Sequence, residues 1–140
     1  MRGECVARPG EEPQFMRPIK AFLVEDSPVI RESLIATLEE LTSIVIVGSA
    51  PDETSSVHWL RDPAHEVDLV IVDIFLKSGS GLGVLRAIQS SIPRCKRVVL
   101  SNYATADIRR KCLELGADRV FDKSNEIDAL ITYCVQLASD

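Results

Sequence analysis

Short apolar runs rich in β-branched residues alternate with helical patterns from Pro18 to the end of the chain. One of these runs, Leu69–Val72, is apolar at every position, which indicates a strand that is buried on both faces. Strands of this kind occur in parallel sheets that helices cover on each side, and each parallel connection needs a crossover. The alternation therefore predicts an α/β fold built around a parallel sheet.

The pattern divides into five strand–helix units. Ser27 and Pro28 form a favourable start for the first helix, because serine caps helix N-termini and proline fits the first helical position. Gly48 is expected to end the second strand, Asn125 to cap the last helix, and Gly116 to end the helix before it. The strands are predicted at residues 19–24, 44–47, 67–73, 97–101 and 118–122. The helices are predicted at 28–41, 52–60, 104–115 and 126–137, with another after the third strand that carries Leu82, Leu85 and Ile88.

Such a series predicts a doubly wound (βα)5 sandwich with a five-stranded parallel sheet in the flavodoxin-like order 2-1-3-4-5. In the first helix, one face is expected to carry Ile30, Leu34, Leu38 and Leu41. In folds of this class the ligand site lies at the carboxyl ends of the strands, where the strand order reverses. The residues that follow the strands are therefore the candidates for function.

Length and composition restrict the alternatives. The 140 residues fit one domain, and 46% hydrophobic content is enough for a core without metal or disulfides. Residues 1–17 are interpreted as a flexible tail and residues 18–140 as the domain. The net charge of −5 disfavours direct nucleic-acid binding, and no apolar run reaches the roughly 18 residues of a membrane span. No secretory signal and no C-x-x-C pair is visible, so a cytoplasmic protein with free thiols is expected.

Polar side chains end four of the predicted strands. Glu25 and Asp26 follow the first strand, and Asp73 ends the third. Carboxylates this close together favour a bound cation, and an all-oxygen ligand set favours a hard one such as Mg²⁺. Lys123 and Ser101 would add an ammonium group and a hydroxyl at the same edge, which together make a receptor for a phosphoryl group. The alternative for any one acid is a solvated loop start.

At these positions the sequence resembles the receiver domains of two-component response regulators, over about residues 18–139. Each motif is weak alone, but their order and spacing together are specific. The matching segments are Phe22–Ser27, Val72-Asp73 with Gly79-Ser80-Gly81, Val98–Ser101, and Gly116–Asp118 followed by Asp122–Ser124.

The resemblance implies a role for each site residue. Asp73 would accept a phosphoryl group from the phosphohistidine of a histidine kinase or a histidine phosphotransfer protein. Asp26 and Asp73 would bind Mg²⁺ directly, Glu25 through water, and the carbonyl group of Phe75 would be a further ligand. Lys123 and Ser101 would contact the phosphoryl oxygens. The chain would then be a signalling switch rather than an enzyme, with slow loss of its own phosphate as its only hydrolysis.

Several positions depart from the family pattern. Val120 stands where receivers usually carry the ring that moves on activation, and Phe121 beside it faces the other side of the strand. Tyr103 and Phe75, each two residues past a site residue, are predicted to restrict water and slow hydrolysis of the phosphoryl group. Lys77 replaces a common proline.

Two other functions remain as alternatives: a receiver-like scaffold that works without phosphate, and a small Mg²⁺-dependent phosphatase. Phe75 disfavours the phosphatase, because such enzymes need a second aspartate there. The length suggests a receiver without an output domain, acting on a downstream protein through the face between the helices at 104–115 and 126–137. The basic run Arg109-Arg110-Lys111 is interpreted as a solvated face, with partner docking as the alternative, and His58 and His65 as surface residues.

Overall fold

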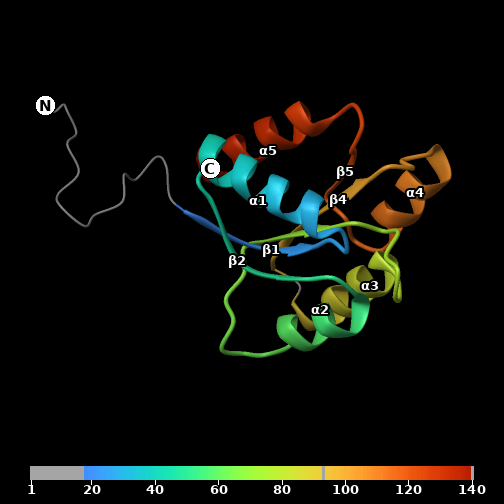
Figure 1. The fold of residues 1–140 in the computed structure, drawn as a ribbon. Coiled ribbons are helices and arrows are strands. Elements are labelled where there is room, and N and C mark those ends of the chain that lie inside the picture. The colour runs from blue at the N-terminus through green and yellow to red at the C-terminus, as the bar shows by residue number, and fades with distance from the viewer. Residues whose placement is uncertain (1–17, 93, 140) are drawn as a thin grey trace, which may run out of the picture.

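The computed structural model describes residues 18–92 and 94–139 of the chain. The expected tail, residues 1–17, lies outside the described residues. Strands and helices alternate along the described part of the chain (Figure 1). The elements are β1 (Ile19–Val24), α1 (Pro28–Leu41), β2 (Ile44–Ala50), α2 (Glu53–Leu60), β3 (Leu69–Val72), α3 (Gly81–Ser91), β4 (Lys96–Ser101), α4 (Ala106–Glu114), β5 (Arg119–Asp122) and α5 (Ile127–Ser139).

The strands form one five-stranded parallel sheet in the order β2-β1-β3-β4-β5, which confirms the predicted fold class and strand order. In Figure 1, α1 and α5 lie on one side of the sheet and α2 and α3 on the other. All four residues of the central strand β3 are buried, as its unbroken apolar run predicted. The carboxyl ends of β1 and β3 are neighbours in this order, because the two strands pair directly.

Each face of the sheet has its own apolar core, because successive strand residues point to opposite sides. Val120 packs in the layer that contains residues of α3 and α4, whereas Phe121 packs in the layer of α1 and α5. The first layer includes Phe22, Val24, Val70, Val72, Val84, Leu85, Ile88, Val99 and Cys112. The second includes Ile19, Ala21, Leu23, Leu34, Leu38, Leu69, Ile71, Val98, Leu100, Leu130 and Cys134.

The second strand is longer than predicted, because Gly48 does not end it. β2 continues to Ala50, and its register against β1 shifts by one residue after Ala21. The glycine is needed for packing rather than for a turn. A Cβ atom at position 48 would lie 2.7 Å from Cζ2 of Trp59. Trp59 in turn stacks on Phe22, with 4.5 Å between the ring centroids.

Two further expectations about α-helices need correction. In α1, Leu34 and Leu38 are buried, but Ile30 and Leu41, in the terminal turns, are 37% and 54% exposed. Asn125 does not adjoin α5, which begins at Ile127; its N–H donates to the Asp122 carbonyl in the preceding turn. The other end signals are confirmed: Ser27 accepts from the Ile30 N–H, and Gly116 is left-handed with φ 97°. Within residues 18–92 and 94–139, no helix is long and apolar enough to cross a membrane.

Candidate functional site

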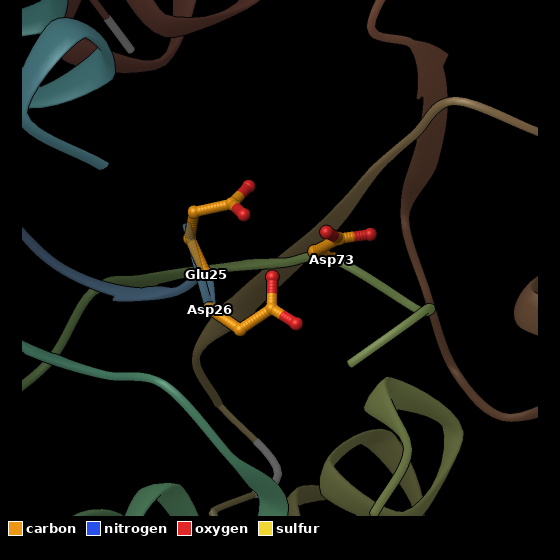
Figure 2. A group of neighbouring side chains, drawn as sticks. All are labelled: Glu25, Asp26 and Asp73. Atoms are coloured by element: carbon orange, nitrogen blue, oxygen red, sulfur yellow. The ribbon is translucent and has the colours of Figure 1, made fainter. Parts of the chain in front are cut away.

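Three carboxylates meet where β1 and β3 end. Glu25, Asp26 and Asp73 each place one oxygen within 4.8 Å of the others, and Figure 2 shows the three side chains at these adjoining strand ends. Glu25 and Asp73 are buried, with 1% and 7% of their surfaces exposed, and Asp26 is partly buried. Three acidic oxygen donors with no nitrogen or sulfur ligand among them fit a hard divalent cation such as Mg²⁺.

The ammonium group of Lys123 lies against two of these carboxylates. Its Nζ atom is 2.5 Å from Oε1 of Glu25 and 3.0 Å from Oδ2 of Asp73. The side chain is only 9% exposed. Lys123 follows directly after β5, and its backbone N–H donates to the carbonyl group of Ser101 at the end of β4. The structure thus brings the cation from the end of β5 to the acids at the ends of β1 and β3, although β4 lies between β3 and β5 in the sheet.

Burial sets the electrostatics of this group. Burial raises the pKa of the Asp73 carboxyl, the hydrogen bond from Lys123 lowers it, and the charge of Glu25 adds to the rise, so the net change is upward. Burial alone would lower the pKa of Lys123. Its hydrogen bonds to Glu25 and Asp73 outweigh burial, and the pKa of the ammonium is raised. A further cation beside Asp73 would therefore stabilise the ionised form of its carboxyl group.

Backbone N–H groups hold each acid in place. Glu25 Oε2 accepts from the Ser27 N–H at 3.1 Å, and Asp73 Oδ1 accepts from the Phe75 N–H at 3.2 Å. Asp26 Oδ2 accepts from the Lys77 N–H at 2.7 Å. Receivers commonly carry proline at this position, and proline has no N–H to donate. Lys77 therefore makes a backbone contact with Asp26 that proline could not make.

The second half of the site lies on β4 and the segment after it. Ser101 is fully buried, and its Oγ atom accepts from the Tyr103 N–H at 3.2 Å. The rings of Tyr103 and Phe75 meet edge to face, with 5.4 Å between their centroids, and both are exposed. The two rings thus join the segment after Asp73 to the segment after Ser101. Val120 is placed elsewhere, in the core.

Sequence reasoning missed two polar residues near the site. Glu53, the first residue of α2, accepts from the Ser80 N–H at 2.9 Å, at the N-terminus of α3. Its carboxylate would be within 2.2 Å of a Cβ atom at Gly83. Arg109 is the second, a half-buried side chain that contacts the turns after β4 and β5. No sequence motif indicates either residue, because most of their hydrogen-bond partners are backbone groups, which every residue carries.

Comparison with protein-family models matches residues 21–134 to the response regulator receiver domain. The chain belongs to this family. The receiver is 26% identical over 113 residues to the Fimbriae Z protein of Salmonella typhimurium, in an alignment that covers 81% of this chain and 53% of that protein. It therefore spans about half the length of this curated relative.

Solved structures of response regulators share the fold of this receiver. A LuxR-family two-component response regulator from Aurantimonas sp. superposes with a TM-score of 0.78 at 21% identity, covering 86% of this chain and 85% of that one. A response regulator from Burkholderia pseudomallei, solved with a phosphorylated aspartic acid, a calcium ion and citrate, gives a TM-score of 0.71 at 20% identity. That match covers 86% of this chain and 69% of the other.

Proposed function

We propose that this receiver is a phosphorylation-controlled switch in which Asp73 accepts a phosphoryl group from the phosphohistidine of a histidine kinase or a histidine phosphotransfer protein. The observation that carries the proposal is the joint approach of Glu25, Asp26, Asp73 and Lys123 at the carboxyl edge of the sheet. The three acids suit a divalent cation, and the ammonium group of Lys123 suits the negatively charged oxygens of a phosphoryl group.

The transfer exchanges one bond to phosphorus for another. An oxygen of Asp73 attacks the phosphorus atom, and the bond from phosphorus to the imidazole nitrogen of the donor breaks. The imidazole keeps the electron pair and takes a proton from solvent. Because the attacking carboxylate carries no proton, no general base in the receiver is required. Because Asp73 Oδ1 accepts from the Phe75 N–H while Oδ2 contacts Lys123, the carboxylate is held in one orientation for attack.

Glu25, Asp26 and Asp73 fit a Mg²⁺ ion. The carbonyl group of Phe75 would be a further ligand in this proposal. When bound, the ion would neutralise negative charge on the acids and on the incoming phosphoryl group. The Burkholderia response regulator that holds a calcium ion and a phosphorylated aspartic acid supports this assignment by its shared fold. Lys123 would contact the phosphoryl oxygens, and the Ser101 hydroxyl would turn from Tyr103 toward them.

The proposed output is a change in protein–protein contacts, with a downstream partner on the face between α4 and α5. The proposed location is the cytoplasm, where the histidine kinase or phosphotransfer protein would donate the phosphoryl group. The domain is proposed to comprise residues 18–140. No enzymatic turnover of a separate substrate is part of the proposal.

The test is incubation with acetyl phosphate and Mg²⁺, followed by detection of the added phosphoryl mass on intact protein. We expect an adduct that survives acid, is removed by hydroxylamine, and is lost in Asp73→Asn. Absence of any adduct on the wild-type chain would favour a scaffold that works without phosphate. An adduct that persists in Asp73→Asn would place the acceptor elsewhere.

A further inference from the structure

Arg109, on α4, makes side-chain hydrogen bonds to three separate segments. Its Nε atom donates to the carbonyl group of Ala104 at 3.0 Å, and one terminal nitrogen donates to the carbonyl group of Val120 at 2.9 Å. The other terminal nitrogen is 2.7 Å from Oε1 of Glu126. A guanidinium fork can satisfy three acceptors in one plane, which an ammonium group cannot do with the same geometry.

In the sequence, these three partners lie close to Ser101 and Lys123, the two residues proposed to contact the phosphoryl oxygens. Ala104 lies three residues after Ser101, Val120 lies three before Lys123, and Glu126 lies three after it. Ser101 and Lys123 are themselves joined by a backbone hydrogen bond of 2.9 Å. Arg109 therefore connects the turn after β4 to both ends of the segment that carries the lysine.

Glu126 fixes the far end of this connection. Its Oε1 atom accepts from Arg109 and also from the N–H of Asp122, the residue before Lys123. The Glu126 N–H donates back to the carbonyl group of Asp122 at 2.8 Å. The turn between β5 and α5 is thus closed on itself and tied to α4, which restricts where Lys123 can place its side chain.

The neighbouring Arg110 makes a different contact. It pairs with Asp107 one turn away on α4, and the two side chains are 68% and 83% exposed. Arg109 and Glu126 are each 37% exposed. The basic run is therefore not uniform, and the prediction of a solvated face fails at Arg109. Arg110 offers a matched control with equal charge, on the same helix, without the bridging contacts.

The metal half of the site is built without Arg109. Glu25 and Asp26 follow β1, Asp73 follows β3, and the N–H groups of Ser27, Phe75 and Lys77 hold these carboxylates. The Arg109 side chain donates instead to strand β5 and to the turns after β4 and β5. Lys123 joins the two halves through Glu25 and Asp73, but different groups hold each half in place, so each can be followed by its own measurement.

We propose that Arg109 is a positioning residue for phosphoryl transfer: its bridge among Ala104, Val120 and Glu126 holds Ser101 and Lys123 at the separation that one phosphoryl group requires. This inference rests on the proposed function at Asp73. The Arg109 side chain also links the turn after β4 to strand β5 by hydrogen bonds to Ala104 and Val120. Val120 is the position where receivers usually carry an aromatic ring.

The experiment compares Arg109→Ala, Arg109→Lys and Arg110→Ala with the wild-type chain. The initial rate of acetyl phosphate labelling and the affinity for beryllofluoride report on the phosphoryl half of the site. The affinity for Mg²⁺ alone, from calorimetric titration, reports on the metal half. Arg109→Ala is expected to label roughly tenfold more slowly and to bind beryllofluoride more weakly, because misplacement of positioned groups carries a cost of this order. Its Mg²⁺ affinity is expected not to fall, because the N–H groups of Ser27, Phe75 and Lys77 still hold the three carboxylates.

Arg109→Lys should recover part of the rate, since an ammonium group can meet one or two of the three acceptors. Arg110→Ala should match the wild type in every measurement.

Equal labelling of Arg109→Ala and wild type would overturn the inference and leave the proposed function intact. A parallel loss of Mg²⁺ affinity would also overturn it, because a general loosening of the fold would then explain both effects. No labelling of the wild type would contradict the proposed function and this inference together. If Arg109→Ala does not fold, Arg109→Lys becomes the test. It must then label more slowly than the wild type without losing Mg²⁺ affinity.

Discussion

The Nζ atom of Lys123 lies 2.5 Å from Oε1 of Glu25, although 98 positions separate the two residues in the chain. Both side chains are almost fully buried, with 9% and 2% of their surfaces exposed. A buried carboxylate needs a cation or several donors, and Lys123 provides the cation for Glu25 and for Asp73 at once. In the absence of a divalent ion, the charge balance of the site depends on this one ammonium group.

Lys123→Met should therefore destabilise the receiver when no divalent ion is present. Removing one partner of a buried ion pair costs about 3 kcal/mol or more, because the remaining carboxylates lose their compensation. Urea unfolding should show this loss, and added Mg²⁺ should restore a large part of it. Lys20→Met is the control, because Lys20 pairs with Glu66 at the surface, where such pairs contribute about 0.5 kcal/mol. Equal losses in both variants would contradict this account of the site.

Asp73→Asn should be more stable than the wild type at neutral pH without divalent ions. Burial raises the pKa of Asp73, so the folded state holds this proton more tightly than the unfolded state does. The stabilisation from the protonated form is complete below the unfolded pKa and is lost as pH rises through the folded one. The difference between variant and wild type should therefore shrink as pH falls into the acidic range, as measured by unfolding at a series of pH values. A difference independent of pH would rule out this cause.

Gly81→Ala and Gly83→Ala should differ sharply. A Cβ atom at Gly81 would lie 2.2 Å from the Asp73 carbonyl oxygen, which is backbone and cannot move aside without displacing the site. At Gly83 the close neighbour is the carboxylate of Glu53, the end of a flexible side chain. We expect Gly81→Ala to lose about 2–3 kcal/mol of stability and to impair labelling.

Gly83→Ala should instead lie within about 1 kcal/mol of the wild type, since alanine favours the helix while Glu53 is displaced. Chemical denaturation and acetyl phosphate labelling of both variants provide the comparison. A Gly83→Ala variant as impaired as Gly81→Ala would show that Glu53 is a rigid part of the site.

Tyr103→Ala should shorten the lifetime of the phosphorylated state. The Tyr103 ring meets Phe75 edge to face, and both residues stand two positions past a proposed site residue. Removal of one ring opens a path for the attacking water, and we expect hydrolysis to accelerate several-fold. Decay of the adduct after removal of the donor measures this rate. Tyr133→Ala, which removes a ring that packs against Phe121 in the α1 and α5 layer, controls for loss of an aromatic group. Unchanged decay in Tyr103→Ala would contradict the proposed control of water access.

The sequence was sufficient for the fold and for the acidic cluster because both depend on local patterns. A continuous apolar run identified β3, and parallel strands bring the residues after them to one edge, so Glu25 and Asp73 could be placed together. Gly48 was misjudged because glycine signals a turn, whereas here its missing side chain makes room for Trp59.

Arg109 was misjudged for another reason. Two of its three acceptors, at Ala104 and Val120, are backbone carbonyl groups, which every residue carries and which leave no trace in the sequence. Glu53 has the same character, since it accepts from the backbone of Ser80. Contacts of this kind depend on how turns approach helices in three dimensions, and periodicity does not encode them.

The order in which the chain is made gives the Lys123–Glu25 contact a further meaning. Glu25 follows β1, the first strand of the described sheet to be synthesised, whereas Lys123 follows β5, the last strand of that sheet. An incomplete chain that ends before β5 would hold three acids at the sheet edge without the ammonium group of Lys123, which compensates two of them. Docking of the final strand therefore supplies charge compensation as well as apolar contact, which favours a late, cooperative closure of the fold during synthesis.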